Sequence, residues 1–214
     1  MIFKSLKYKR FAAMFLDLVI ISIFTTLLFS NSISNPKYNE YLEVSKDYTK
    51  VVTEVPNYNT QSLEELNDYV NKVSDITYRY QKSNIFFYVW YVVLSFLYFV
   101  VFQFSTGGKT LGKRLYRIKV TNKESNKNIS IFRLMGKFLL VGEFYLFDGI
   151  VIISMLNIVG SLLINDVKVL FFYTVICNLI GILIEVAMII SFLTSKTNET
   201  ISDKIFKTKV IEMK

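Results

Sequence analysis

The amino-acid sequence predicts an all-α integral membrane protein with four transmembrane helices and both termini in the cytoplasm. Of its 214 residues, 52% are hydrophobic and only 20% are charged, too apolar a composition for a domain whose whole surface faces water. The apolar residues gather in stretches of about 20, the length that crosses about 30 Å of hydrocarbon. None of the stretches alternates as a barrel strand would. The predicted spans cover residues 11–29, 85–104, 138–160 and 169–193.

The first span follows a basic N-terminal segment, in which Lys and Arg side chains occur without any acid between residues 4 and 10. A cleaved signal peptide ending near residues 30–32 is the alternative interpretation. Asp17 lies well inside the apolar stretch, however, and the stretch is longer than the roughly 7–15 residues of a signal-peptide core. We therefore favour a retained transmembrane helix.

The segment between the first two spans, residues 30–84, is net acidic. This places it outside the cell, because cytoplasmic segments hold the excess of Lys and Arg. Its second half has apolar residues at helical spacing, which predicts an amphipathic helix that begins at Thr60 or Ser62 and leads into the second span. Glu65, three residues after Ser62, indicates a capping box. The apolar face of this helix consists of Leu63, Leu66, Val70, Val73, Thr77 and Tyr80.

The segments that flank the last two spans are basic. The loop of residues 105–137 and the Lys-rich tail of residues 194–214 therefore belong in the cytoplasm by the same charge rule. The net charge of +8 follows from this topology, and we expect no nucleic-acid partner. The partner that the basic loop predicts is instead the lipid bilayer, with its anionic headgroups.

The basic loop also contains two short apolar patterns. Leu111, Leu115 and Ile118 fall on one helical face, which predicts a short juxtamembrane helix lying among the headgroups, with its cations on the other side. Residues Ile118–Thr121 and Thr208–Ile211 both alternate in the manner of strands, and we expect them to pair beneath the membrane.

The residue inventory argues against an enzyme. The chain has no histidine and one cysteine, Cys177, which removes the usual zinc sites and the Ser-His-Asp and Cys-His arrangements. Gly107 to Lys113 has the spacing of a phosphate-binding loop, but Arg114 replaces the Ser or Thr that holds magnesium, and no strand precedes the loop. We expect no catalytic residue, no metal and no cofactor.

Carboxylates inside the predicted spans are the features most suggestive of function. An acid at the centre of a lipid-facing helix costs roughly 2.5–3.5 kcal/mol, so these side chains should face the bundle interior or a wet cavity. Two spacings support this: Arg10, Ala13 and Asp17 share one helical face, and so do Thr174, Asn178, Gly181 and Glu185. The intramembrane polar candidates are Asp17, Glu143, Asp148, Asn178 and Glu185.

These acids allow two interpretations, which the sequence leaves open. They form a path for an ion or a proton, or they stay protonated and join helices through hydrogen bonds. Asp17 and Arg10 lie about two helical turns apart, so they interact only if the arginine reaches along the helix or through water.

Several short motifs recur in order along the chain. An arginine, an alanine and an aspartate mark the first span, a pattern similar to G-x-T-L-G-K-R-L follows the second, an arginine precedes the third, and an aspartate with a T-x-V strand closes the chain. The matching residues are Arg10, Ala13, Asp17, Gly108, Thr110, Leu111, Gly112, Lys113, Arg133, Asp203 and Thr208. Together these motifs resemble the RDD family of bacterial membrane proteins, named for one arginine and two aspartates. Two departures are Ser202, where the family often has histidine, and a longer outer segment.

The resemblance implies a single membrane domain over residues 1–214, in the bacterial plasma membrane, that transports a small cation, a proton or another unidentified ligand. In that hypothesis the site includes Asp17, with Arg10 at its inner entrance. Glu185 joins the site on the membrane argument alone, because it has no counterpart in the family pattern. The alternative is a non-transporting membrane partner or assembly protein that binds another membrane protein. Because four helices make a small transporter, we expect a homo-oligomer or a complex with a membrane protein.

Overall fold

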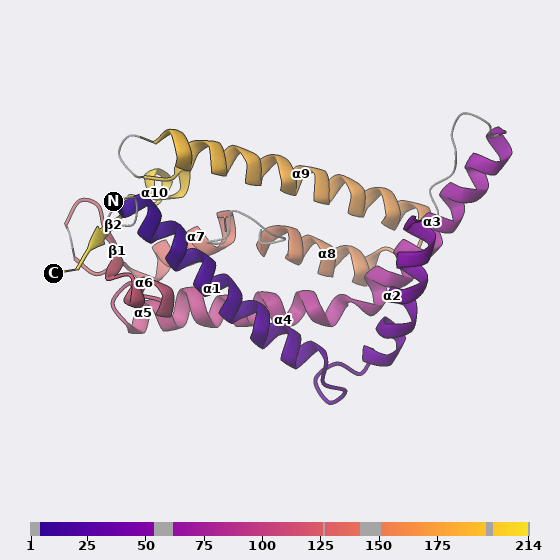
Figure 1. Ribbon diagram of the computed structural model, residues 1–214, viewed down its shortest axis with the longest axis horizontal. Coiled ribbons are helices and arrows are strands. Elements are labelled where there is room, and N and C mark those ends of the chain that lie inside the picture. The colour runs from indigo at the N-terminus through magenta and orange to yellow at the C-terminus, as the bar shows by residue number, and fades with distance from the viewer. Residues whose placement is uncertain (1–4, 54–61, 126, 142–150, 196–198, 214) are drawn as a thin grey trace.

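The computed structural model describes residues 5–53, 62–125, 127–141, 151–195 and 199–213. It is an elongated bundle of helices with a two-stranded sheet at one end, beside both termini (Figure 1). We call this end the sheet end. The opposite end, formed by α2 (Tyr38–Thr53) and α3 (Leu63–Ser83), is called the cap end.

Three helices run the length of the bundle and are long and apolar enough to cross a membrane. They are α1 (Leu6–Phe29), the continuous helix Ile85–Ser105, and α9 (Val167–Thr194). The second consists of α4 (Ile85–Phe96), the π-helix η2 (Leu97–Phe102) and α5 (Gln103–Ser105). Between 17% and 28% of the most apolar window of each helix is buried, so most of its apolar side chains face outward. This exposure is favourable in lipid and unfavourable in water.

The predicted span over residues 138–160 corresponds to two helices. They are α7 (Ile131–Val141), which packs near the sheet end against η2, and α8 (Val151–Leu163), which packs against α4 and α9. Residues 142–150, between them, lie outside the described residues. By itself α8 is an apolar helix shorter than a membrane crossing requires.

The sheet end contains two short helices and two strands. Helix α6 (Leu111–Leu115) leads into β1 (Ile118–Asn122), and α10 (Ile201–Ile205) leads into β2 (Thr208–Glu212). The strands are antiparallel, with Val120 opposite Val210. Ile118 and Val120 are almost fully buried and join the hydrophobic core that extends along α1 and α4.

The prediction that Ile118 shares a helical face with Leu111 and Leu115 is wrong. Helix α6 ends at Leu115, and Arg117 has a left-handed backbone with φ of 52°, which turns the chain into β1. The backbone of Gly108 lies directly against β1, because a Cβ atom there would lie 2.1 Å from the carbonyl oxygen of Val120. Only glycine fits that position, since its φ is also positive, at 89°.

The cap end contains the predicted amphipathic helix. The capping box of Ser62 and Glu65 is confirmed, with the Ser62 hydroxyl accepting from the Glu65 amide and the Glu65 carboxylate accepting from the Ser62 amide. Helix α2, which the sequence analysis did not predict, packs against α3. The rings of Tyr48 and Tyr80 stack between them at a centroid distance of 4.7 Å.

Candidate functional site

Asp17 is buried in α1 and is held by groups from two other elements. Its carboxylate accepts hydrogen bonds from the Tyr98 hydroxyl (2.5 Å), the Thr110 hydroxyl (2.5 Å) and the Gly112 amide (2.8 Å). The last two donors belong to the N-terminal turn of α6, where free backbone amides favour an anion. The chain's own carboxylate therefore occupies the position at which a phosphate-binding loop would hold phosphate.

Two small residues of the motif allow this approach. Ala13 is 1% exposed, and a Cβ atom on Gly112 would lie 2.2 Å from the Ala13 carbonyl oxygen. A glycine at this position lets the backbones of α1 and α6 touch. The small side chain of Ala13 and the missing side chain of Gly112 thus allow α1 and α6 to pack closely.

The sequence predicts that the cations of this helix face the headgroups. Lys113 instead faces the interior of the protein. It is 7% exposed, and its ammonium nitrogen lies 3.3 Å from the side-chain oxygen of Gln103 when that amide is oriented so that its nitrogen donates to the Phe99 carbonyl. The reason is geometric: α6 has only five residues and is pinned by Asp17, so one turn of it faces the protein.

Asp203 is the most buried carboxylate at the sheet end, with no exposed surface. It accepts from the Arg10 guanidinium at 2.7 Å, the Lys137 ammonium at 2.9 Å and the Thr208 hydroxyl at 2.9 Å. Burial opposes ionisation, but the nearby cations of Lys137 and Arg10 hold the pKa of Asp203 below its usual range. One carboxylate thus ties α1, α7 and β2 to α10. Arg10 pairs with this aspartate and not with Asp17.

The two helix–strand units at the sheet end have the same construction. Thr110 and Thr200 each cap a five-residue helix, and Arg117 and Lys207 each adopt a left-handed turn before the strand, with φ of 52° and 50°. The acidic and basic side chains occupy reversed positions in the two units. In the first, an acid on the long helix α1 meets α6 beside Lys113. In the second, Lys137 on α7 meets the aspartate on α10.

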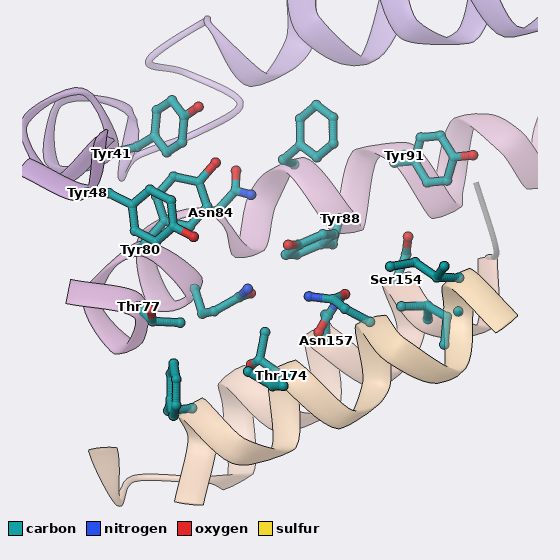
Figure 2. Close-up of a pocket in the computed structure, with 18 of the residues that line it drawn as sticks. Tyr41, Tyr48, Thr77, Tyr80, Asn84, Tyr88, Tyr91, Ser154, Asn157 and Thr174 are labelled. Atoms are coloured by element: carbon teal, nitrogen blue, oxygen red, sulfur yellow. The ribbon is translucent and has the colours of Figure 1, made fainter. Parts of the chain in front are cut away.

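A cavity of about 800 Å³ lies toward the cap end, between α4 and the pair α8 and α9. Figure 2 shows tyrosines from α2, α3 and α4 on one side of it and polar residues of α8 and α9 on the other. The labelled lining residues are Tyr41, Tyr48, Thr77, Tyr80, Asn84, Tyr88, Tyr91, Ser154, Asn157 and Thr174.

The polar stripe predicted on the last span lines this cavity. Thr174, Asn178, Gly181 and Glu185 are all among its lining residues. Glu185 is the one charged side chain among the described residues that line it; the lining includes no lysine and no arginine. The cavity therefore favours cations.

Two amide residues of the cavity wall have buried side-chain oxygens. Gln81 and Asn157 are 6% and 4% exposed, and neither side-chain oxygen has a hydrogen-bond partner among the described residues. A buried acceptor without a donor costs about 1–3 kcal/mol, so such groups are retained where something else satisfies them. Both residues line the cavity, but these two oxygens are themselves buried and are not exposed to its interior.

The predicted site residues thus divide between two places. Asp17, with the glycine motif, and Asp203 lie at the sheet end, whereas Asn178 and Glu185 lie in the cavity. Arg133 donates to the Lys207 carbonyl at 3.2 Å and supports the turn before β2. Glu143 and Asp148 lie outside the described residues.

The sequence did not predict the roles of three residues. Lys137 was counted only as a loop cation, and Gln81 and Asn157 were not considered. The similarity between residues 110–120 and 200–210 is the signal that could have drawn attention to Asp203 and its buried partner. No local signal marks the two amides, because their roles depend on contacts between distant segments.

Comparison with models of known protein families shows to which family the chain belongs. The model of the RDD family matches residues 7–157. The chain belongs to the RDD family. The matched residues include Arg10, Asp17, the Gly108–Lys113 motif and Arg133, whereas Asp203 and Thr208 lie beyond them, so their assignment to the family pattern stays a prediction. No curated protein and no solved structure matches this RDD chain.

Proposed function

We propose that this RDD protein transports a small cation across the bacterial plasma membrane and that Glu185 is the carboxylate that binds it. The cavity carries the proposal, because Glu185 is the one charge among its described lining residues and the polar side chains of Thr174 and Asn178 accompany it. A polar cavity between apolar helices is the usual setting of a transporter's binding site.

The proposed orientation places the sheet end in the cytoplasm. The basic loop and tail lie at that end, and the acidic segment with α2 and α3 lies at the other. In this orientation the cavity lies toward the outer side, and we propose that it opens there. The fourth crossing consists of α7 and α8 together, since α7 packs near the sheet end and α8 beside the cap end.

The sheet end closes the cytoplasmic side in this arrangement. Asp17 joins α1 to α6, and Asp203 joins α1 to α10 and α7. Release of a cation into the cytoplasm requires α1 to separate from at least one of these partners. We assign Asp17 and Arg10 to this closure, so that Glu185 alone of the described carboxylates contacts the cation.

The test is a flux measurement in proteoliposomes. Wild-type protein should carry Na⁺, K⁺ or protons down an imposed gradient, and Glu185→Gln should reduce the rate at least tenfold because the cavity loses its one charge. Glu64→Gln is the matched control, because Glu64 is exposed on α3, and its rate should stay within about twofold of wild type. Equal rates for Glu185→Gln and a wild type that shows flux would contradict the proposal.

A further inference from the structure

The cavity is much larger than an inorganic cation requires. A monovalent ion with six waters takes up roughly 200 Å³, at about 30 Å³ per water. The cavity holds about 800 Å³, within the range of about 300–1,000 Å³ typical of sites for organic molecules. Its lining extends along α9 from Phe171 to Glu185, roughly 21 Å at about 1.5 Å per residue. An elongated organic molecule fits this shape.

The wall of the cavity opposite α9 is made of aromatic rings. Tyr41, Tyr80 and Tyr48 form one cluster, in which Tyr80 lies at centroid distances of 5.7 Å from Tyr41 and 4.7 Å from Tyr48. Tyr88 and Tyr91 continue the wall along α4 (Figure 2). Ring faces attract cations, and tyrosine rings also bind apolar groups.

The Tyr80 phenol, in this cluster, is uncharged. Burial, together with the neighbouring Tyr41, raises the pKa of Tyr80, so its phenol keeps its proton at physiological pH. The described residues that line the cavity therefore present a single carboxylate at its far end and tyrosine ring faces nearer the cap end. This combination suits a ligand with one positive charge, hydrogen-bond donors and an apolar body.

We propose that the cavity binds an organic monocation of the alkyl- or arylammonium class, with its ammonium group toward Glu185 and its body along the tyrosine wall. This inference rests on the proposed function, because it names the ligand class of the same cavity. The ammonium group donates to the Glu185 carboxylate while the tyrosine rings pack against the body, so that one molecule uses both features of the cavity.

The test uses 2-phenylethylammonium as the probe and 2-phenylethanol as its neutral counterpart. Titration calorimetry on the purified full chain in detergent should show binding of the ammonium compound at least tenfold tighter than binding of the alcohol. Because both measurements use wild type, misfolding of a variant cannot produce the difference. Equal affinities, or no binding of the ammonium compound, would overturn the inference.

Two variants locate the bound probe. Glu185→Gln should weaken 2-phenylethylammonium about tenfold and leave 2-phenylethanol unchanged. Tyr91→Leu should weaken the ammonium compound about threefold to tenfold, whereas Tyr91→Phe, which keeps the ring, should stay within twofold of wild type. Unchanged affinity in both Glu185→Gln and Tyr91→Leu would place the probe elsewhere and overturn the inference.

Flux of the same probe separates this inference from the proposed function. Tight binding of 2-phenylethylammonium without any flux in proteoliposomes would support the ligand class and contradict transport. Flux of Na⁺ that depends on Glu185, without binding of the ammonium compound, would support transport and overturn the ligand class.

Discussion

The sheet end and the cavity treat their buried polar groups in opposite ways. At the sheet end, Asp17 accepts from three donors, and Asp203 is bonded to two cations and a hydroxyl. In the cavity, the side-chain oxygens of Gln81 and Asn157 have no partner among the described residues. A polar cluster that satisfies itself holds helices together, whereas the cavity leaves Glu185 and its polar neighbours beside open space that a ligand can enter. The two regions therefore indicate structure and binding, respectively.

The largest effect is expected from Asp203→Asn. The substitution removes the charge that compensates Arg10 and Lys137, and breaking a buried ion pair in this way costs about 3–5 kcal/mol. Thermal unfolding of the purified protein in detergent should show the loss. The matched control is Glu212→Gln, whose exposed pair with Lys9 is worth about 1 kcal/mol or less. Equal losses in the two variants would remove the structural role that we give to Asp203.

Gly112→Ala should lower the free energy of unfolding by about 1–3 kcal/mol. The new methyl group would lie 2.2 Å from the Ala13 carbonyl oxygen and 2.9 Å from the Asp17 carboxylate, so α6 must move away from α1. Gly181→Ala on α9 is the control, because its methyl group would meet only the Ile153 side chain, at 3.2 Å. Unfolding temperatures of the two variants measure the difference, and equal values would contradict the close approach of α1 and α6.

Asn157→Leu should change the stability in the opposite direction from the two preceding substitutions. Its side-chain oxygen is buried without a donor among the described residues, so an apolar replacement of similar size should be neutral or stabilising by about 1 kcal/mol. Thermal unfolding measures the change, and a large loss of stability would show that the Asn157 amide is part of the packing.

The smallest effect is expected from pH. The pKa of Asp203 is lower in the folded protein than its ordinary value of about 3.9, so its stabilising contribution is complete above that value and is lost as pH falls further. The stability difference between wild type and Asp203→Asn should therefore stay constant from pH 8 to pH 5 and shrink only below about pH 4. Denaturation at several pH values measures it, and a difference that declines between pH 7 and pH 6 would contradict the ion-pair assignment.

The sequence predicted those features that depend on local pattern. Hydropathy located three long helices, the Ser62–Glu65 pair located the start of α3, and the spacing of Thr174 to Glu185 identified the lining of the cavity on α9. Each depends on residues within a few turns of one another, where helical geometry relates position to contact.

Features that depend on contacts between distant segments were not predictable in this way. Arg10 reaches Asp203 at the other end of the chain, and no helical spacing relates the two. The burial of Lys113 follows from the anchoring of α6 by Asp17, and the unpartnered Asn157 is recognised only once α3 and α9 surround it. Hydropathy also predicted one span over residues 138–160, where the structure describes α7 and α8 on either side of residues 142–150, which lie outside the described residues.

The most direct test of a cavity that is open to the outside and closed to the cytoplasm is cysteine labelling. Asn178→Cys, in a Cys177→Ser background, places a thiol in the cavity lining, roughly 16 Å from the start of α9 at about 1.5 Å per residue. Its control is Ile176→Cys, at a similar depth on a side chain that is 55% exposed on the apolar surface. A membrane-impermeant maleimide added outside intact cells should label Asn178→Cys and not Ile176→Cys. Labelling of both positions, or of Asn178→Cys only from the cytoplasmic side, would contradict the account.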